Sequence, residues 1–252
     1  MLQVIQVPNF PLINPGDDIA QLILNSLKDA SIDLDDNDIF VIAQSIISKA
    51  ENRIIDLQSI TPSYDALNYA KIIDKNPKFI ELILKESNKI LKYSSKAIIV
   101  ENKLGFVCAN AGIDQSNSGN VDHVTLLPLD PDESARQIQK KIEEKTGKKI
   151  AIIISDTQGR PFRNGAINVG IGIAGFKDPI QNYKGQKDLF GYILQTTEVN
   201  IIDELASAAE LIMGESNEGF PVILIKGYKF PRGTSTSKTL IRNKKEDLFR
   251  DD

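Results

Sequence analysis

A run of five apolar residues, Ile150 to Ile154, constrains the fold of this 252-residue chain more than any other feature. Four of the five are isoleucine, and such a run predicts a strand that is buried on both faces. The run leads directly into Ser155, Asp156 and Thr157, where we expect the strand to end. An acid and a hydroxyl at the mouth of a buried strand are costly unless a partner binds them. We therefore expect a functional site at this point.

Two arginines, Arg160 and Arg163, follow in a glycine-containing loop. Oxygens of Asp156 and Thr157 are suitable ligands for a hard cation. Guanidinium groups three residues apart suit a phosphate or a carboxylate. The segment therefore predicts a metal site beside an anion site, as phosphoryl chemistry requires. The alternative is a structural ion pair between an arginine and Asp156.

Composition removes several classes of function. The net charge of −4 argues against a general nucleic-acid binder, and the single cysteine excludes an intrachain disulfide framework. The single histidine excludes a zinc site with several histidines. His123 lies in a polar loop and is interpreted as a surface residue, and Cys108 as a small buried hydrophobe. No apolar run approaches the roughly 20 residues of a membrane span, and the N-terminus does not resemble a signal peptide. We therefore expect a cytoplasmic protein without a membrane partner.

The order of predicted elements favours an α+β fold with mixed sheets and flanking helices over a doubly wound parallel sheet. Strands are predicted near residues 2–7, 38–43, 97–101, 105–109, 150–154, 168–175 and 222–225. Helices are predicted at 17–30, 63–73, 77–91, 130–147 and 200–213, with a polar loop at 45–51. We expect one catalytic unit over residues 1–230, with a possible division into two lobes near residue 95, and a polar C-terminal tail at 231–252.

Three loops carry acids that could act together. The first holds Asp114 and Asn117, the second Asp156, and the third, after a helix, Glu215. Taken singly, the first also reads as an Asx-rich connection and the third as a glycine helix cap and turn. Taken by itself, Lys49 is interpreted as a solvated surface lysine. Acidic loops without histidine favour Mg²⁺ or Mn²⁺ over zinc, and two such metals with a phosphate clamp fit phosphoryl transfer.

Two further motifs are given structural interpretations. The chain has no P-loop, and its GxGxxG match at 170–175 opens no helical pattern, so we do not assign a dinucleotide site to it. Asp130 and Asp132 are most simply helix N-cap residues.

Several long motifs, taken in order, resemble the coenzyme F420-0:L-glutamate ligase family. They are FPLINPGDD, ISKAENRI, NAGIDQSN, LLPLDPDESA, SDTQGRPFRNG, KDLFGYILQTT and DELASAAELIMGE. The resemblance runs from about Val4 to Gly227 and does not cover the tail after Tyr228. It implies a family-specific two-lobed α+β fold and a homodimer.

The resemblance also implies a reaction. The carboxylate of the phospholactyl deazaflavin precursor accepts the γ-phosphoryl group of GTP, and the amine of L-glutamate attacks the acyl phosphate. The products are an amide, GDP and phosphate, and a second glutamate is then added by γ-linkage. No protein nucleophile is needed, which agrees with the scarcity of His and Cys. The implied cofactors are two divalent metals, Mg²⁺ or Mn²⁺, with a monovalent cation as a further candidate.

Residue roles follow from matching positions. Asp114, Asp156 and Thr157 resemble ligands of divalent metals, and Glu215 resembles a ligand of the second metal. The positions that resemble GTP contacts are Phe10, Pro11, Leu12, Ile13, Gln44, Ser45, Lys49, Asn117, Met213, Gly214, Glu215, Ser216, Asn217, Glu218, Gly219 and Phe220. Gln44 departs from the small hydroxyl residue of the family. We ourselves assign Arg160 and Arg163 to the phosphodiester or carboxylates of the substrate.

Two other hypotheses remain open at this point. One is a related nucleotide-dependent amide ligase with another carboxylate acceptor. The other is a non-catalytic protein that binds metal and GTP. Intact Asp114, Asp156, Thr157 and Glu215 argue against the second.

Overall fold

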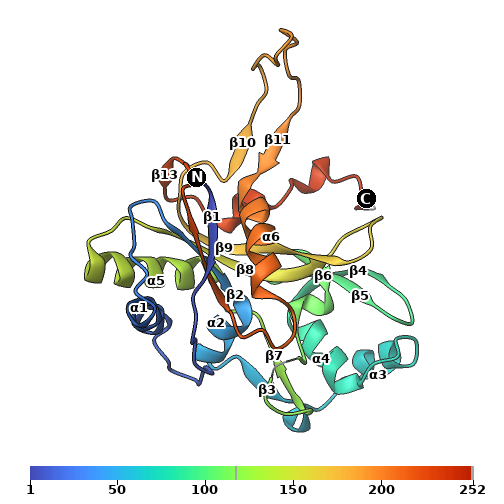
Figure 1. Cartoon of the computed structure of the whole chain (residues 1–252). Helices are drawn as coiled ribbons and strands as arrows, with labels where there is room; N and C mark the ends of the chain where they lie inside the picture. Colours follow the sequence, from blue (N-terminus) through green and yellow to red (C-terminus); the bar gives the residue numbers. More distant parts are fainter. Residues whose placement is uncertain (117, 251–252) are drawn as a thin grey trace.

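The isoleucine run lies at the centre of a six-stranded mixed sheet in the computed structural model, which describes residues 1–116 and 118–250 (Figure 1). The strands, in spatial order, are β1 (Gln3–Gln6), β12 (Val222–Lys226), β2 (Ile39–Ala43), β8 (Ala151–Gly159), β9 (Ala166–Phe176) and β13 (Arg232–Gly233). Only β2 and β8 run parallel, and the other neighbours in this sheet are antiparallel. The expected α+β class with mixed sheets is confirmed.

Helices cover both faces of this sheet. Residues of α1 (Ile19–Asp29) and α5 (Pro131–Thr146) pack with Ile152 and Ile154 on one face. Residues of α6 (Ile201–Met213) pack with Ala151 and Ile153 on the other. Successive side chains of a strand point to opposite faces, so β8 is buried on both sides, as its sequence predicts.

The ends of these helices follow their sequence signals. Asp18, Asp130 and Asn200 each accept a backbone hydrogen bond from the first turn of the helix they precede. Such caps satisfy N–H groups that have no partner inside the helix. Gly147, with φ of 71°, and Gly214, with φ of 69°, end α5 and α6.

A second hydrophobic core lies beneath the main sheet in the view of Figure 1. It is built from the helices α3 (Tyr64–Ala70) and α4 (Pro77–Lys85) and from two small antiparallel sheets. Their strands are β4 (Ser87–Tyr93), β5 (Ile98–Asn102) and β6 (Val107–Ala109) in one sheet, and β3 (Ile54–Asp56) and β7 (His123–Thr125) in the other. The boundaries of the predicted lobes and tail stay a prediction.

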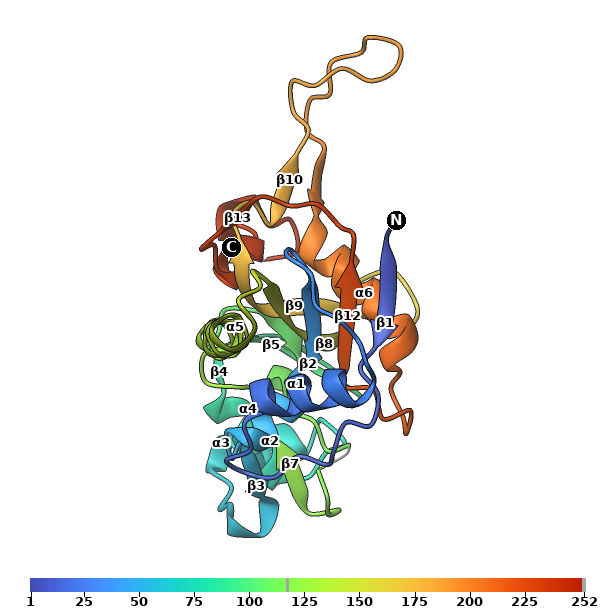
Figure 2. The same ribbon diagram turned by 60° about the vertical axis from the view of Figure 1, so that its left-hand side comes forward.

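A two-stranded arm projects from the body of the protein and ends in a long loop (Figure 2). Its strands are β10 (Ile180–Asn182) and β11 (Glu198–Asn200). The remaining elements are the helix α2 (Gln44–Ala50) and four short 3₁₀ helices, at Leu57–Ser59, Asn110–Gly112, Ser237–Leu240 and Lys244–Glu246. No helix in the described part of the chain is long and apolar enough to cross a membrane.

Three predicted elements were wrong. The polar loop at 45–51 is the helix α2, because Ile46 and Ile47 pack into the main core. The helix predicted over 77–91 ends at Lys85, and residues 87–93 form β4 by pairing with β5. The strand predicted to stop by Thr157 continues to Gly159, because β9 pairs with it along its whole length.

Two glycines of the GxGxxG match have a packing role. A Cβ atom on Gly170 would collide with the Ile202 side chain of α6. A Cβ on Gly172 would come within 2.5 Å of the Pro131 backbone at the start of α5. Glycine lets helices on the two faces approach β9 closely, which explains the motif without a nucleotide.

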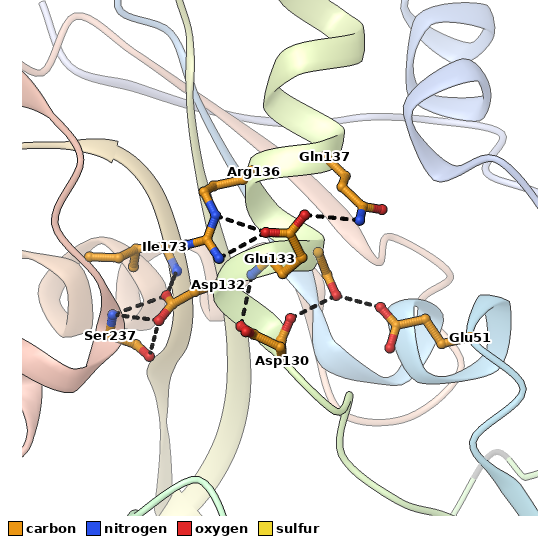
Figure 3. A network of polar contacts seen from close by, with 9 residues as sticks. Glu51, Asp130, Asp132, Glu133, Arg136, Gln137, Ile173 and Ser237 are labelled. Carbon is orange, nitrogen blue, oxygen red and sulfur yellow. Dashed lines mark hydrogen bonds and ion pairs between the residues drawn. The ribbon is translucent and has the colours of Figure 1, made fainter.

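The C-terminal segment is held to the body by buried acids. Asp132, near the start of α5, accepts hydrogen bonds from the Ser237 amide at 3.0 Å and the Ser237 hydroxyl at 3.0 Å (Figure 3). It also accepts one from the amide of Ile173 at 2.8 Å. Further along the C-terminal segment, Lys244 Nζ and Arg250 Nη1 donate hydrogen bonds to the carboxylate of Glu101 in β5, at 2.8 Å and 2.5 Å.

Candidate functional site

A cleft opens where β8 extends beyond the end of β2, its parallel neighbour. β2 ends at Ala43, which lies opposite Ser155, and α2 begins at the next residue. From Asp156 to Gly159, β8 pairs only with β9, so one edge of the strand is uncovered. The polar end of the isoleucine strand therefore faces a hollow, as the sequence predicts.

The hollow has a volume of about 680 Å³. This is within the roughly 300–1,000 Å³ typical of small-molecule sites. Its walls come from the segment after β1, the start of α2, the turn after β6, the end of β8 and the loop after α6. Among the residues singled out from the sequence, those that line it are Phe10, Pro11, Leu12, Ile13, Gln44, Ser45, Lys49, Asp114, Asp156, Thr157, Met213, Gly214, Glu215, Ser216, Asn217, Glu218, Gly219 and Phe220.

Two of the described candidate residues lie outside the cleft. Arg160 and Arg163 lie on the turn between β8 and β9 and are not among the residues that line the cleft. Arg160 Nη1 donates to the carbonyl of Gly165 at 3.1 Å, which braces this turn internally. Their assignment to the substrate stays a prediction. Asn117 lies outside the described residues.

Asp156 lies among acids at the bottom of the cleft. Burial raises its pKa to about 7, and the carboxylates of Asp114 and Glu215 act in the same direction. A hydrogen bond at 3.2 Å from the side chain of Gln158 opposes this shift. Asp114 is itself fixed by Ser116, whose amide donates at 2.8 Å and whose hydroxyl donates at 2.5 Å. The three acids thus converge from three different segments of the chain.

The opposite face of β8 carries a second polar group. The hydroxyl of Thr157 donates to Glu215 Oε1 at 2.5 Å and lies 3.4 Å from Asn168 Oδ1. Asn168 Nδ2 donates to the carboxylate of Glu210, in the last turn of α6. Burial, and then the adjacent Glu215, raise the pKa of Glu210 to about 7.

Lys49 supplies a positive charge from α2. It is half-buried, and burial lowers the pKa of its ammonium while Asp114 opposes this shift. Lys49 lines the cleft, and α2, which begins where β2 ends, positions it there. Its ammonium group can therefore neutralise the charge of an anionic ligand.

The oxygen atoms of the candidate metal ligands are of the type that hard divalent cations prefer. Asp114, Asp156, Thr157 and Glu215 offer only oxygen, and the mutual repulsion that raises the pKa of Asp156 is what a cation would relieve. Within residues 1–116 and 118–250, however, no three His, Cys, Asp or Glu side chains are close enough together to hold a metal ion. The acids therefore form an open arrangement rather than a closed cage.

Sequence reasoning missed several polar residues of the cleft. Glu210, Asn168, Ser155 and Asn110 also line it. In the described part of the chain, the only buried side-chain nitrogens or oxygens without a hydrogen-bond partner are Asn110 Oδ1 and Ser155 Oγ. The signal for Glu210 was available, because an acid four residues after the buried Ala206 lies on the apolar stripe of its helix.

Comparison with known proteins identifies the class as gamma-glutamyl ligases. A model of the F420-0:gamma-glutamyl ligase family matches residues 8–227. The chain therefore belongs to this family, and the resemblance seen in its motifs is confirmed.

Individual relatives match over most of their length. A coenzyme F420:L-glutamate ligase of Methanothermobacter thermautotrophicus is 48% identical over 253 residues, covering 99% of each chain. That of Methanocaldococcus jannaschii is 48% identical over 221 residues, covering 88% of each. That of Archaeoglobus fulgidus is 39% identical over 251 residues, covering 99% of this chain and 96% of the relative.

Proposed function

We propose that this chain is a GTP-dependent ligase that adds L-glutamate to the phospholactyl deazaflavin coenzyme F420-0, and then a second glutamate by γ-linkage. Family membership supports the ligase class and the acceptor. The observation that carries the finer proposal is that the segments expected to contact GTP and the acids expected to hold cations line one cleft. Separate sites would not allow phosphoryl transfer between bound partners.

The proposed chemistry needs positioning and charge neutralisation more than a protein nucleophile. The acceptor carboxylate attacks the γ-phosphorus of GTP, giving an acyl phosphate and GDP. The glutamate amine then attacks the acyl carbon, phosphate leaves, and the amine loses its proton. The one cysteine, Cys108, is unsuited to a nucleophilic role, because burial raises its pKa to about 12.

Individual residues have definite tasks in this proposal. Lys49 lies where it can neutralise phosphate charge. Asp114, Asp156, Thr157 and Glu215 would hold the divalent cations, Mg²⁺ or Mn²⁺. Such cations neutralise the phosphate oxygens during transfer. Phe10 and its neighbours Pro11 to Ile13 provide an apolar wall against the nucleotide.

A homodimer is proposed as well. The tip of the arm exposes Leu189 and Phe190 almost completely, at 99% and 96%, with Tyr192 beside them. Clustered exposed apolar side chains are typical of interaction surfaces. Sedimentation should give a dimer for the parent chain and a lighter species for a Leu189→Asp, Phe190→Ser double variant. A dimer that persists in the double variant would exclude the arm from the interface.

The ligase proposal is tested by incubating the protein with L-glutamate, Mg²⁺ or Mn²⁺, the deazaflavin precursor and either GTP or ATP. Mass spectrometry should show mono- and diglutamyl products with GTP. Products that form with ATP but not with GTP would show that the co-substrate is ATP instead of GTP. Bound GTP without any adduct would favour a non-catalytic binder or a ligase for another carboxylate acceptor.

A further inference from the structure

The last turn of α6 places an unassigned carboxylate, that of Glu210, in the cleft. It lies directly beside Glu215, which follows the helix after Gly214. The C-terminal end of a helix carries partial negative charge. Two adjacent carboxylates are therefore held at the end of a helix where acids are least favourable.

Four side chains connect Glu210 to Glu215 without interruption. Asn168 donates to Glu210, and its own Oδ1 lies 3.4 Å from the hydroxyl of Thr157. Thr157 donates to Glu215 at 2.5 Å. The four residues carry six side-chain oxygens of carboxylate, hydroxyl and amide type in one region, which is the ligand chemistry of a hard divalent cation.

Asn168 is held rigidly in this chain of contacts. It is 2% exposed and pairs directly with Thr157 across β8 and β9. Its backbone carbonyl accepts a hydrogen bond from the hydroxyl of Ser207 at 3.0 Å, which ties the strand to α6. A fixed amide donor of this kind aims the carboxylate that it contacts.

The two acids have no basic partner in the part of the chain that the structure describes. Within the described part of the chain, neither Glu210 nor Glu215 forms an ion pair with a lysine or arginine. Glu210 is half-buried, and a carboxylate withdrawn from water is normally paired or bound to a metal.

An independent observation points to a ligand at the same place. Ser155 is 2% exposed, lines the cleft, and its hydroxyl oxygen has no partner among the described residues. Because side chains alternate along β8, Ser155 lies on the same face as Thr157, next to the four-residue chain of contacts. A buried hydroxyl left unpaired in a cleft requires an explanation, and a bound ion with its water is one.

We propose that Glu210 is a further cation ligand, which shares with Glu215 and Thr157 one subsite for a divalent cation, and that Asn168 is the positioning residue that aims it. The inference rests on the proposed function, because it adds ligands to the cation site of that reaction. It separates the cleft into two subsites, one on each face of β8, with Asp114 and Asp156 at the other.

The experiment is a titration of the full-length, EDTA-treated protein with Mn²⁺, followed by electron paramagnetic resonance, in the absence of nucleotide and substrate. The variants are Glu210→Gln, Glu210→Asp and Asn168→Ala. Glu204→Gln is the matched control, since Glu204 is an exposed acid of the same helix. Thermal unfolding is recorded for each variant without metal.

Glu210→Gln should weaken one class of Mn²⁺ site about 10- to 100-fold and leave the other class unchanged. Asn168→Ala should weaken the same class about 10-fold. Glu210→Asp, which keeps the charge, should fall between the parent and Glu210→Gln. Glu204→Gln should bind as the parent does.

Parent-like Mn²⁺ binding by both Glu210 variants would overturn the proposal, and so would equal losses in Glu204→Gln. The metal-free Glu210→Gln protein should unfold at or above the temperature of the parent, because the variant removes carboxylate repulsion. A purely structural Glu210 would instead lower that temperature. Failure of the ligase assay with intact Mn²⁺ binding would count against the proposed function and leave this subsite standing.

Discussion

Acids gather in two regions of this protein, and the two sets have opposite surroundings. Near the start of α5, Asp132 accepts hydrogen bonds from three donors, the amide of Ile173 and the amide and hydroxyl of Ser237 (Figure 3). At the end of α6, Glu210 and Glu215 face each other. One acid lies at the positive end of a helix and the others at the negative end of another.

The same contrast extends to neighbouring acids. Glu101 is buried but receives both Lys244 and Arg250, which lower its pKa. Asp156 is surrounded by other carboxylates. The satisfied acids attach the C-terminal segment to the body, whereas the acids of the cleft repel one another. Local arrangements that weaken the fold are expected where a ligand binds, so this contrast separates the acids that stabilise the fold from those that we propose bind a ligand.

The largest effect on stability is expected for Asp132→Ala. Removing this carboxylate leaves buried donors of Ile173 and Ser237 without a partner, which should lower the free energy of unfolding by about 3 kcal/mol. Urea denaturation measures the change. Glu133→Ala is the matched control, because the Glu133 side chain is exposed and contacts Arg136 and Gln137 of its own helix, and its effect should be much smaller. Equal losses of unfolding free energy in the two variants would show that Asp132 stabilises the fold no more than an exposed acid does.

A smaller effect is expected for Glu101→Gln, which weakens the attachment of Lys244 and Arg250. We expect trypsin to cleave after Lys244 about 10-fold faster at pH 7.5, since cleavage follows the population of the detached segment. Glu246→Gln is the control, because Glu246 makes no ion pair among the described residues. An unchanged cleavage rate would show that Glu101 does not hold the tail.

The contacts of Glu101 with Lys244 and Arg250 should also make the attachment of the C-terminal segment depend on pH in a defined direction. Binding of the two cations lowers the pKa of Glu101 from its ordinary value of 4.5. A carboxyl with a lowered pKa in the folded state contributes stability above pH 4.5, and this is lost as the pH falls through the folded-state pKa. Hydrogen exchange in residues 244–250 should therefore differ between parent and Glu101→Gln at pH 6 and converge as the pH falls below the lowered pKa of Glu101. A difference that persists in acid would contradict this.

The smallest effect on stability is expected for Arg163→Ala, since the turn that carries Arg163 is braced through Arg160. If Arg163 contacts an anionic substrate, the variant should raise one Michaelis constant about 10-fold, the loss of one charge-assisted hydrogen bond. Steady-state kinetics with each substrate varied in turn measures this. Unchanged constants for GTP, glutamate and the deazaflavin would end the assignment.

The sequence was most predictive where one local pattern determined the structure. The isoleucine run predicted β8, and Asp130, predicted as an N-cap residue, caps α5. The same prediction was wrong for Asp132, whose carboxylate binds Ile173 and Ser237 instead. Local patterns failed where distant pairing decided the outcome. Residues 87–93 continue a helical pattern but form β4, because β5 offers a partner, and β9 extends β8 to Gly159.

The site shows the same limit. Asp156 was predicted as a candidate site residue from its place after a buried strand, but its proximity to Asp114 and Glu215 depends on three segments meeting. The position of Glu210 on the apolar stripe of its helix was visible in the sequence, but not the site that it faces. Only the packing of α6 against β9, through Asn168, brings that carboxylate into the cleft.

The most direct test compares thermal unfolding of the parent and Asp156→Asn, first in EDTA and then with Mg²⁺ and GTP. Ligands at about 100 times their dissociation constant should raise the midpoint of the parent by about 6 °C. Asp156→Asn should start at or above the parent in EDTA, because it removes a buried charge among like charges, and should gain almost nothing from the ligands. A variant that starts well below the parent and then gains as much as the parent would contradict the claim that the acids of the cleft serve binding rather than stability.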